Sequence, residues 1–493
     1  MATYFNEYFN VSREAVDKYG AFNISLINDL PLFIDPFLLF HSQNPQYQKL
    51  HQDILRYVMF LRDRVVSGKI NGDLKKAWFF FPEVRQNWLG FSKVGNGGTG
   101  LGKDFADSLI KNLKVLFSDF GSEQITKGSH IEKVCLVDDR VGRDNISDFT
   151  TNLIKHYLCE YTQEFARKNI APHLRKVVWV EKAVFDYQTT SWQRRQYELP
   201  WLEEDRDYVL LTPKDILTRD ENWINKTDMV RDFDSIPKAI PDSELRGQVF
   251  AYFEDQLRKD VKDGKEPTQA ERKQAAIKTF IKFPMLVDYY IRHKENNGDK
   301  AIDISADRVR ETQTIFEDQL RELRRELAKL TNFYNLAGST YEETHLRIAY
   351  LKDVIETKGG HRFFWHDGKP IHRESDLHVL TRLVWFGSPS DVGTEANDGR
   401  GPVDFKISRG ALDKTLVEMK LAKNTSLERN LLKQLGIYQA ASDAKHGIKV
   451  IIYFSDEEKK RVDAILKKLN LVGHRDVVLI DARADNKPSG SKA

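Results

Sequence analysis

A short stretch near the C-terminal end, residues 401–423 (GPVDFKISRGALDKTLVEMKLAK), constrains the fold of this chain more than any other feature. Its pattern predicts two strands joined by a turn, with Asp404 in the first strand. Side chains alternate between the two faces of a strand, so Glu418 and Lys420 in the second strand share a face. A carboxylate and an ammonium in an otherwise apolar strand cost free energy unless something uses them. Together with Asp404 they form the donor set of a divalent-metal site with a catalytic lysine.

Triplets of an acidic residue, any residue and lysine recur elsewhere in the chain, so the spacing alone decides little. They occur at residues 73–75, 260–262, 263–265, 367–369 and 443–445. All of those lie in polar, turn-like or helical surroundings, where a solvated charge explains them. The triplet at Glu418 lies in an apolar strand pattern with an acidic strand before it. From these residues, a metal site and a cross-strand ion pair both remain open.

The residues that follow add a second motif. Asp404, then Glu418-x-Lys420, then a helix with Gln434 and Tyr438 (QLGIY) resembles the PD-(D/E)XK nuclease superfamily. The Gln-x-x-x-Tyr spacing is similar to its RecB-type branch, and the resemblance covers about residues 360–483. The downstream order agrees, and the predicted elements are a helix at 426–441, a strand at 448–454, a helix at 456–469 and a strand at 477–482. The sequence departs from the family's Pro-Asp dipeptide, because Val403 separates Pro402 from Asp404.

The resemblance implies an α/β restriction-endonuclease-like domain at residues 359–484, with a mixed sheet flanked by helices. It implies Mg²⁺-dependent hydrolysis of phosphodiester bonds, with Mn²⁺ as the alternative metal and DNA, or else RNA, as substrate. Asp404 and Glu418 would bind the metal with the Met419 carbonyl, and Lys420 would orient or deprotonate the attacking water.

The superfamily often places a further acidic residue upstream, and two residues are candidates for it. Glu374 opens an amphipathic helix, and Glu395 precedes the first strand; either would hold a second metal through water. Gln434 and Tyr438 share a helix face and would contact the metal-bound water or the DNA backbone. Nearby cations suit phosphate contacts but could equally be solvated surface charges: Arg400, Lys406, Arg409 and Lys423.

Length and composition limit the number of domains, the partners and the cellular compartment that we expect. A chain of 493 residues with 41% hydrophobic residues is long enough for several globular domains. The net charge of +3 gives no global signature of a nucleic-acid binder, so any such binding must come from local patches. Cys135 and Cys159 are too few for a disulfide framework, which favours a reducing cytoplasm. We expect neither a signal peptide at the start nor a membrane span, because the most apolar stretch, residues 30–40, is short and interrupted by proline and aspartate.

The sequence outside residues 359–484 predicts three further parts of the chain. Residues 1–300 form an α+β region for sensing, regulation or nucleic-acid binding, with one or two subdomains. Residues 301–358 form a helical linker whose segment 307–330 carries a heptad stripe. That helix could pair with a second subunit or fold back on the next helix as an internal hairpin. Residues 485–493 read as a disordered tail.

Local signals in residues 1–170 predict individual elements. Asp35 before Pro36 is typical of a helix N-cap, although a functional carboxylate is the alternative. A helix is predicted at 46–66, a strand at 78–84, and a helix from Ser147, as its N-cap, to about Phe165.

Three segments of this region could bind a ligand. Gly97 to Lys103 fits the start of a phosphate-binding loop, yet Asp104 replaces the residue that would hold magnesium, and a flexible loop or a phosphate contact are the alternatives. In the segment 130–158, four aspartates lie close in sequence to His130 and Glu132: Asp138, Asp139, Asp144 and Asp148. The pattern predicts either a structural loop or a ligand-sensing site. Residues 192–225 interleave aromatic and basic residues, which suits either nucleotide stacking or aromatic packing.

A large partner region joined to a nuclease resembles single-protein restriction or anti-phage defence nucleases, in which the N-terminal part would respond to a phage-derived trigger. Two other function classes remain open. One is a nucleic-acid binding or sensing protein whose nuclease-like domain is inactive. The other is an ATP-binding regulator that uses the Gly95–Lys103 loop.

Overall fold

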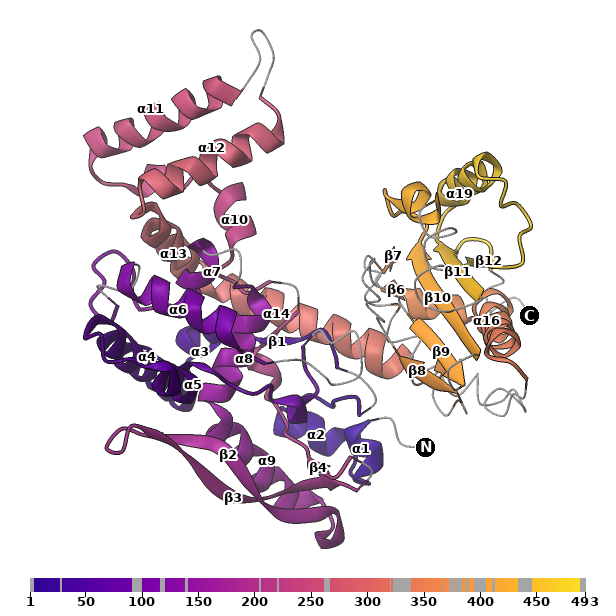
Figure 1. The fold of residues 1–493 in the computed structure, drawn as a ribbon, viewed down its shortest axis with the longest axis horizontal. Helices are drawn as coiled ribbons and strands as arrows, with labels where there is room; N and C mark the ends of the chain where they lie inside the picture. The colour runs from indigo at the N-terminus through magenta and orange to yellow at the C-terminus, as the bar shows by residue number, and fades with distance from the viewer. Residues whose placement is uncertain are drawn as a thin grey trace. The chain divides into compact units, whose positions relative to one another are not determined.

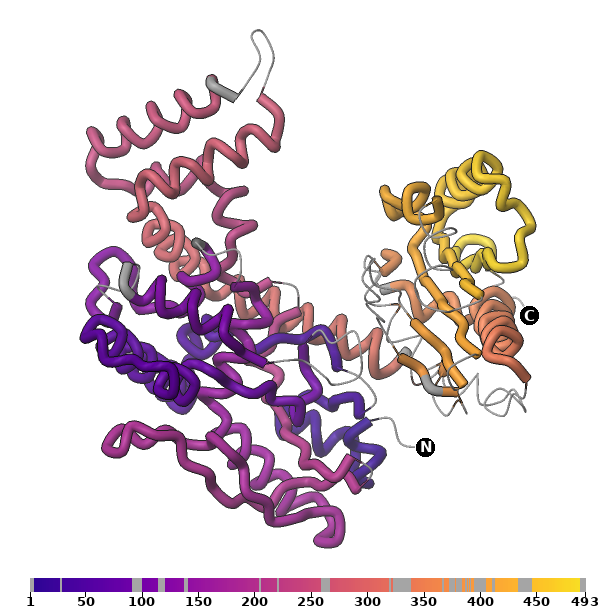
Figure 2. The backbone as a smooth tube through the Cα atoms, in the orientation of Figure 1, coloured from indigo at the N-terminus to yellow at the C-terminus, as the bar shows by residue number. Residues whose placement is uncertain are grey.

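The chain divides into two compact units, which we describe separately. Of the described residues, the first unit, here called the N-terminal unit, comprises residues 4–24, 30–90 and 100–309; the C-terminal unit comprises residues 25–26 and 29 and those from Arg310 onward. Figures 1 and 2 show the backbone of this computed structural model. The structure describes residues 4–26, 29–90, 100–115, 120–137, 141–203, 205–219, 221–260, 267–319, 321, 338–366, 368–371, 377, 384–385, 388, 390–393, 405–409, 413–432 and 446–487.

The N-terminal unit is mainly helical, with a long β-ribbon on one side (Figure 1). Its helices are α1 (Phe5–Tyr8), α2 (Arg13–Tyr19), α3 (Pro36–His41), α4 (Pro45–Val66), α5 (Gly72–Phe79), α6 (Lys103–Val115), α7 (Lys133–Val137), α8 (Arg143–Leu153), α9 (Lys155–Asn169), α10 (Lys226–Arg231), α11 (Ser243–Asp260), α12 (Gln269–Lys282), α13 (Leu286–Asn296) and α14 (Gly298–Gln313), which a π-helix (Thr314–Gln319) continues. The ribbon is β2 (Arg175–Asp186) antiparallel to β3 (Ser191–Leu202), extended by β4 (Asp207–Tyr208), and β1 (Phe33–Ile34) pairs with β5 (Leu217–Thr218).

Several elements predicted from the sequence are confirmed. Asp35 caps α3, because its Oδ1 accepts a hydrogen bond from the Phe37 amide at 3.0 Å and Pro36 occupies the first helical position. Helix α4 spans the predicted 46–66, and α6 begins at Lys103. In each case the signal was local: a capping side chain, or an apolar stripe of helical period.

Two predictions in this unit are wrong. Ser147 is not an N-cap: α8 begins at Arg143 after Gly142, and the Ser147 hydroxyl accepts a hydrogen bond from the Ile34 amide at 2.9 Å. The Ser147 hydroxyl thus joins two segments that are far apart in the sequence, and a local sequence pattern cannot reveal such a contact. Residues 78–84 form no strand; Trp78 and Phe79 end α5, and Phe81 makes a single bridge to Leu101.

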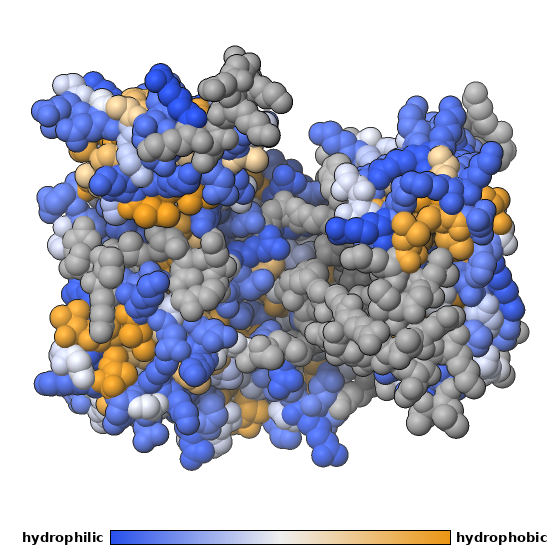
Figure 3. All heavy atoms as spheres, turned by 45° about the horizontal axis from the view of Figure 1, so that its top comes forward, coloured by the Kyte–Doolittle hydropathy of each residue, from blue (hydrophilic) through white to orange (hydrophobic). Residues whose placement is uncertain are grey.

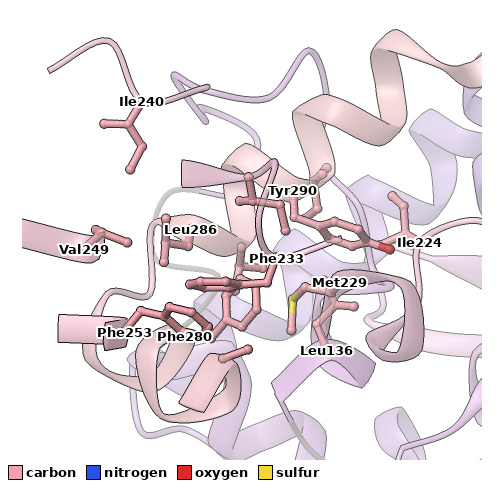
Figure 4. Packing of buried hydrophobic residues seen from close by; sticks show 14 of the residues in the cluster. Leu136, Ile224, Met229, Phe233, Ile240, Val249, Phe253, Phe280, Leu286 and Tyr290 are labelled. Atoms are coloured by element: carbon pink, nitrogen blue, oxygen red, sulfur yellow. The ribbon is translucent and has the colours of Figure 1, made fainter. Parts of the chain in front are cut away.

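One apolar core of the N-terminal unit gathers side chains from α3 and α7 and from α10 to α14 (Figure 4). Phe233 packs against Phe253 and Phe280, with ring centroids 4.6 and 5.4 Å apart. Helices α11 and α12 lie side by side, and residues 261–266 between them lie outside the described residues. Each buried aromatic ring contributes on the order of 2 kcal/mol.

Two buried carboxyl groups lie close together beneath α3. Asp35 is fully buried and accepts hydrogen bonds from the Phe37 and Trp223 amides at 3.0 and 2.7 Å. Glu132 is 1% exposed, and its Oε1 has no hydrogen-bond partner among the described residues. Burial, reinforced by the charge of Asp35, raises the pKa of Glu132 to about 8. The segment at His130 and Glu132 is therefore part of the core, and His130 pairs with buried Glu295 at 3.0 Å.

Glu132→Gln should stabilise the protein increasingly as the pH rises. The folded pKa of Glu132 is about 8 and the ordinary value is 4.5, so between them the folded state holds a proton that the unfolded state has lost. Stability therefore falls as the pH rises through this window, by about 1.4 kcal/mol per unit of pKa shift, and glutamine removes that loss. Thermal unfolding at pH 4.5, 6.5 and 8.5 would show it, with the exposed Glu254→Gln as the control. A difference in Tm that does not change with pH would contradict this assignment.

The C-terminal unit is built on a five-stranded mixed sheet in the order β12-β11-β10-β9-β8. Its strands are β8 (Asp391–Gly393), β9 (Phe405–Arg409), β10 (Asp413–Leu421), β11 (His446–Tyr453) and β12 (Val477–Asp481), and β6 (Trp365–His366) pairs with β7 (Lys369–Pro370) beside it. The pairs β8–β9 and β9–β10 are antiparallel, whereas β10–β11 and β11–β12 are parallel. This confirms a mixed sheet with flanking helices.

Helices cover both faces of this sheet (Figure 1). Helix α16 (Thr340–Thr357) is fixed to one face, where the Thr340 hydroxyl contacts both Asp413 and Thr415 of β10. Helix α19 (Asp456–Lys468) covers the other face and buries Ile465 against Ile451. Residues 340–357, which the sequence assigned to a linker, are thus packed on the sheet.

The edge strand β12 is tied to α16 as well as to β11. The Asp481 amide donates to Glu356 at 2.8 Å, and Lys352 donates to the Leu479 carbonyl at 2.6 Å. The predicted helix at 456–469 and strand at 477–482 match α19 and β12. Of the heptad segment 307–330, α14 and the π-helix account for residues up to 319, and most of the remainder lies outside the described residues.

The molecular surface is mostly hydrophilic on the face drawn in Figure 3, with apolar side chains gathered in a few patches. No helix in the described part of the chain is both long enough and apolar enough to cross a membrane.

Candidate active site

Glu418 and Lys420 lie on β10, where the strand has neighbours on both sides. Glu418 is 5% exposed, and Lys420 is half-buried. Paired residues of neighbouring strands project from the same face. Glu418 pairs with Lys449 of β11, and Leu416, two residues before it, pairs with Lys406 of β9. Among the described residues, the face opposite α16 therefore carries Glu418 together with Lys406, Lys414, Lys420 and Lys449.

Lys449 was missed in the sequence analysis. It is 8% exposed, and its ammonium donates to the Leu431 carbonyl at 3.3 Å. Burial lowers the pKa of Lys449; the charge of Glu418 opposes this shift and that of Lys420 adds to it. The available signal was its position as the single charged residue in the apolar strand IKVIIYF.

The opposite face of the sheet carries a separate buried network around Glu343 of α16. Glu343 is fully buried and pairs with Arg347 at 2.9 Å and with Arg409 of β9 at 2.6 Å. The hydroxyls of Ser388 and Ser390 each donate to its carboxylate at 2.6 Å. Burial alone would raise the pKa of Glu343, but the two serine hydrogen bonds and the Arg347 charge hold it below its usual value.

The predicted phosphate-contacting cations have different surroundings. Arg409 is engaged by Glu343, by Ser390 and by the Gly338 carbonyl, so a phosphate would compete with these partners. Lys423 donates to the Ile371 carbonyl at 2.9 Å, and Lys406 is half-buried on β9. The other predicted site residues lie outside the described residues: Asp404, Glu374, Glu395, Arg400, Gln434 and Tyr438.

Within the described residues, no group of three or more His, Cys, Asp and Glu side chains could hold a metal ion. Glu418 itself offers the hard oxygen donors that Mg²⁺ prefers. The neighbouring ammonium groups fit an anionic substrate rather than a further cation. The residues present are thus compatible with a magnesium ligand at Glu418.

The glycine-rich segment before α6 is partly described. Gly100 adopts a φ of +66°, and a Cβ there would lie 2.6 Å from the Glu83 nitrogen and the Phe81 carbonyl oxygen. This glycine is therefore needed for close backbone packing. Glu83, Asp144 and Asp148 lie near one another, and burial followed by the charges of its two neighbours raises the pKa of Asp148 to about 8. Residues 91–99 and Asp138 and Asp139 lie outside the described residues.

Comparison with known proteins adds two partial matches. Residues 10–225 match the family model "Domain of unknown function (DUF8370)", and residues 340–456 match "Domain of unknown function (DUF8371)". No curated protein and no solved structure matches the chain. The second matched segment begins with α16 and includes Glu343, Glu418, Lys420 and Lys449, so α16 and the strands β8 to β11 belong to one matched segment.

Proposed function

We propose that the C-terminal unit is a Mg²⁺-dependent nuclease of the PD-(D/E)XK type that hydrolyses phosphodiester bonds in DNA. The observation that carries this proposal is the position of Glu418 and Lys420 on one face of β10, with Glu418 buried. Burying a carboxylate beside ammonium groups is costly in a strand that serves packing alone.

The order of elements supports the proposed fold. After α16 and the short β6–β7 pair come the antiparallel strands β8, β9 and β10, the parallel strand β11, the helix α19 and the parallel strand β12. Asp404 directly precedes Phe405, which pairs with Val417, the neighbour of Glu418. The sequence order and this register therefore agree with the motif.

In this proposal Glu418 and Asp404 hold the metal, with Glu374 or Glu395 as an outer ligand. Bound Mg²⁺ would lower the pKa of its water and stabilise the oxygens of an in-line displacement. Lys420 orients the attacking water and offsets charge on the phosphate, while Gln434 and Tyr438 contact the water or the DNA backbone. Lys449 adds a positive charge beside Glu418.

We further propose that the protein acts in restriction or anti-phage defence, with the N-terminal unit as the part that recognises a trigger. This role follows from the resemblance and from the presence of a second compact unit with its own family match. A homo-oligomer formed through residues 307–330 belongs to the same proposal.

Lys420→Ala should lower cleavage by about 100-fold or more, because a residue that moves or positions the proton of the attacking water contributes at least that much. Purified protein is incubated with plasmid, linear and single-stranded DNA and with RNA, in Mg²⁺ or EDTA. Lys414→Ala is the matched control, since Lys414 lies on the same face of the same strand and is also half-buried. Equal cleavage by Lys420→Ala and the wild type would contradict the site.

The position of Lys449 supports one alternative function: a domain that binds nucleic acid without cleaving it. Its pairing with Glu418 could satisfy that carboxylate as a cross-strand ion pair. In that case the wild type and Lys420→Ala would bind DNA and neither would cleave it in Mg²⁺ or Mn²⁺.

A further inference from the structure

Two neighbouring cavities in the N-terminal unit share the side chains of Arg56 and Tyr187. The smaller cavity has a volume of about 350 Å³ and lies between α4, α9 and the β2–β3 ribbon. The larger, of about 590 Å³, lies between α4 and the loop at residues 121–129. Both are within the range of small-ligand sites. Neither involves the C-terminal unit.

The smaller cavity has an aromatic wall built from both strands of the ribbon and from α4. Tyr57 packs against Phe185 and Trp192, with ring centroids 4.8 and 5.2 Å apart. The Trp192 indole donates to the Tyr57 hydroxyl at 3.1 Å, and that hydroxyl donates to the Trp78 carbonyl at 2.8 Å. Tyr57 is itself buried, so these contacts hold the half-buried rings of Phe185 and Trp192 in place before any ligand arrives, as suits a flat heteroaromatic group.

Arg56 lies where the two cavities meet. Its guanidinium carbon is 4.0 Å from the centre of the Tyr187 ring, so stacking fixes its plane. In the part of the chain that the structure describes, this exposed guanidinium makes no hydrogen bond or ion pair. Its donors are free to bind an anion in the bidentate manner that suits phosphate.

Acidic side chains also line the two cavities. Three acidic residues of the lining already have partners: Asp63 binds Arg62, Glu123 accepts hydrogen bonds from Gly121 and Ser129, and Glu160 pairs with His156 at 3.5 Å. Asp53 is a further carboxylate at the rim of the smaller cavity.

Two further cationic side chains, Lys49 and Lys127, line the cavities. The ammonium groups of Lys49 and Lys127 have no ion pair among the described residues. The Lys127 backbone is anchored, because its amide donates to Glu295 at 2.7 Å, so its side chain extends from a fixed point. A cationic ligand would compete with Arg56 for the Tyr187 ring.

We propose that this pair of cavities binds a free nucleotide, with its base against the aromatic wall and its phosphate on Arg56. Base stacking on aromatic side chains contributes about 1–3 kcal/mol per base, and a bidentate arginine adds charge-assisted hydrogen bonds to the phosphate. This site does not depend on the proposed nuclease activity.

Isothermal titration calorimetry on the full chain in EDTA tests the site with AMP, GMP, CMP and UMP, the matching nucleosides and inorganic phosphate. At least one monophosphate should bind with a Kd below about 1 mM, more tightly than its nucleoside or phosphate alone. Arg56→Ala should weaken that binding by about tenfold or more. Arg64→Ala is the matched control, because Arg64 lies on the same helix and stacks on Phe60 and Trp78 but does not line either cavity.

A single-stranded hexanucleotide separates a free nucleotide from a strand of nucleic acid. A free-nucleotide site binds the monophosphate at least as tightly as the hexanucleotide. Binding of the hexanucleotide alone would overturn the proposal. So would the absence of binding by all four monophosphates, or equal losses in Arg56→Ala and Arg64→Ala.

Discussion

Glu418→Gln is expected to lower Mg²⁺-dependent DNA cleavage by about 100-fold or more at a fixed metal concentration. Glutamine keeps the shape of the side chain but removes the negative charge that would bind the metal. Because a ligand is lost, more Mg²⁺ should partly restore the rate. Lys420→Ala should behave differently: its maximal rate falls, while the Mg²⁺ concentration that gives half of that rate changes little.

The measurement is the initial cleavage rate as a function of Mg²⁺ concentration for each variant. Glu342→Gln is the control, since Glu342 lies on α16 and pairs at the surface with Arg475 at 2.9 Å. If Glu418→Gln cleaves at the wild-type rate, Glu418 is not a metal ligand. The lysines around it would then be explained by packing and ion pairing.

Glu343→Gln should lower the free energy of unfolding of the C-terminal unit by about 3 kcal/mol or more, because it leaves the buried Arg347 and the half-buried Arg409 without their negative charge. Glu343 has no exposed surface and joins α16 to β9 through Arg409. Its neighbour Glu342 is half-exposed, and Glu342→Gln should change stability by less than about 1 kcal/mol. The pair is a matched comparison of one chemical change at adjacent positions.

Urea unfolding, with hydrogen exchange of peptides from α16 and β9, gives the readout on the full chain. The low pKa of Glu343 means that its contribution is present above the ordinary value of 4.5 and is lost as the pH falls through the lower folded value. The difference between the wild type and Glu343→Gln should therefore shrink in acid. Equal stabilities at pH 7 would show that the network contributes nothing.

The sequence predicted those elements whose signals are local. Alternation of side chains identified β10, and Ser455, which caps α19, lies directly before the three acidic residues of its first turn. The apolar run Val450–Tyr453 of β11 fits a strand covered on both faces. In the candidate site, the same alternation was enough to place Glu418 and Lys420 on one face.

What the sequence could not predict depends on contacts between distant segments. Apart from Arg347, one turn along α16, the partners of Glu343 come from residues 388, 390 and 409, so no spacing along the chain identifies the rest of the network. The role of Lys449 in the candidate site depends on its strand pairing with Glu418, and the role of Ser147 depends on its hydrogen bond with the Ile34 amide. The assignment of residues 340–357 to a linker had a similar cause, because the surface that covers α16 is formed by later strands.

The attachment of β12 to both β11 and α16 bears on where this domain ends. The matched family segment stops at residue 456, before α19 and β12. A fragment that ends there would expose the backbone hydrogen-bonding groups of β11 and the apolar face that α19 covers. Such exposed strand edges and apolar faces favour aggregation. Expression of the C-terminal half by itself should therefore retain the polypeptide through Arg483, whose guanidinium holds Asp481 at 2.7 Å.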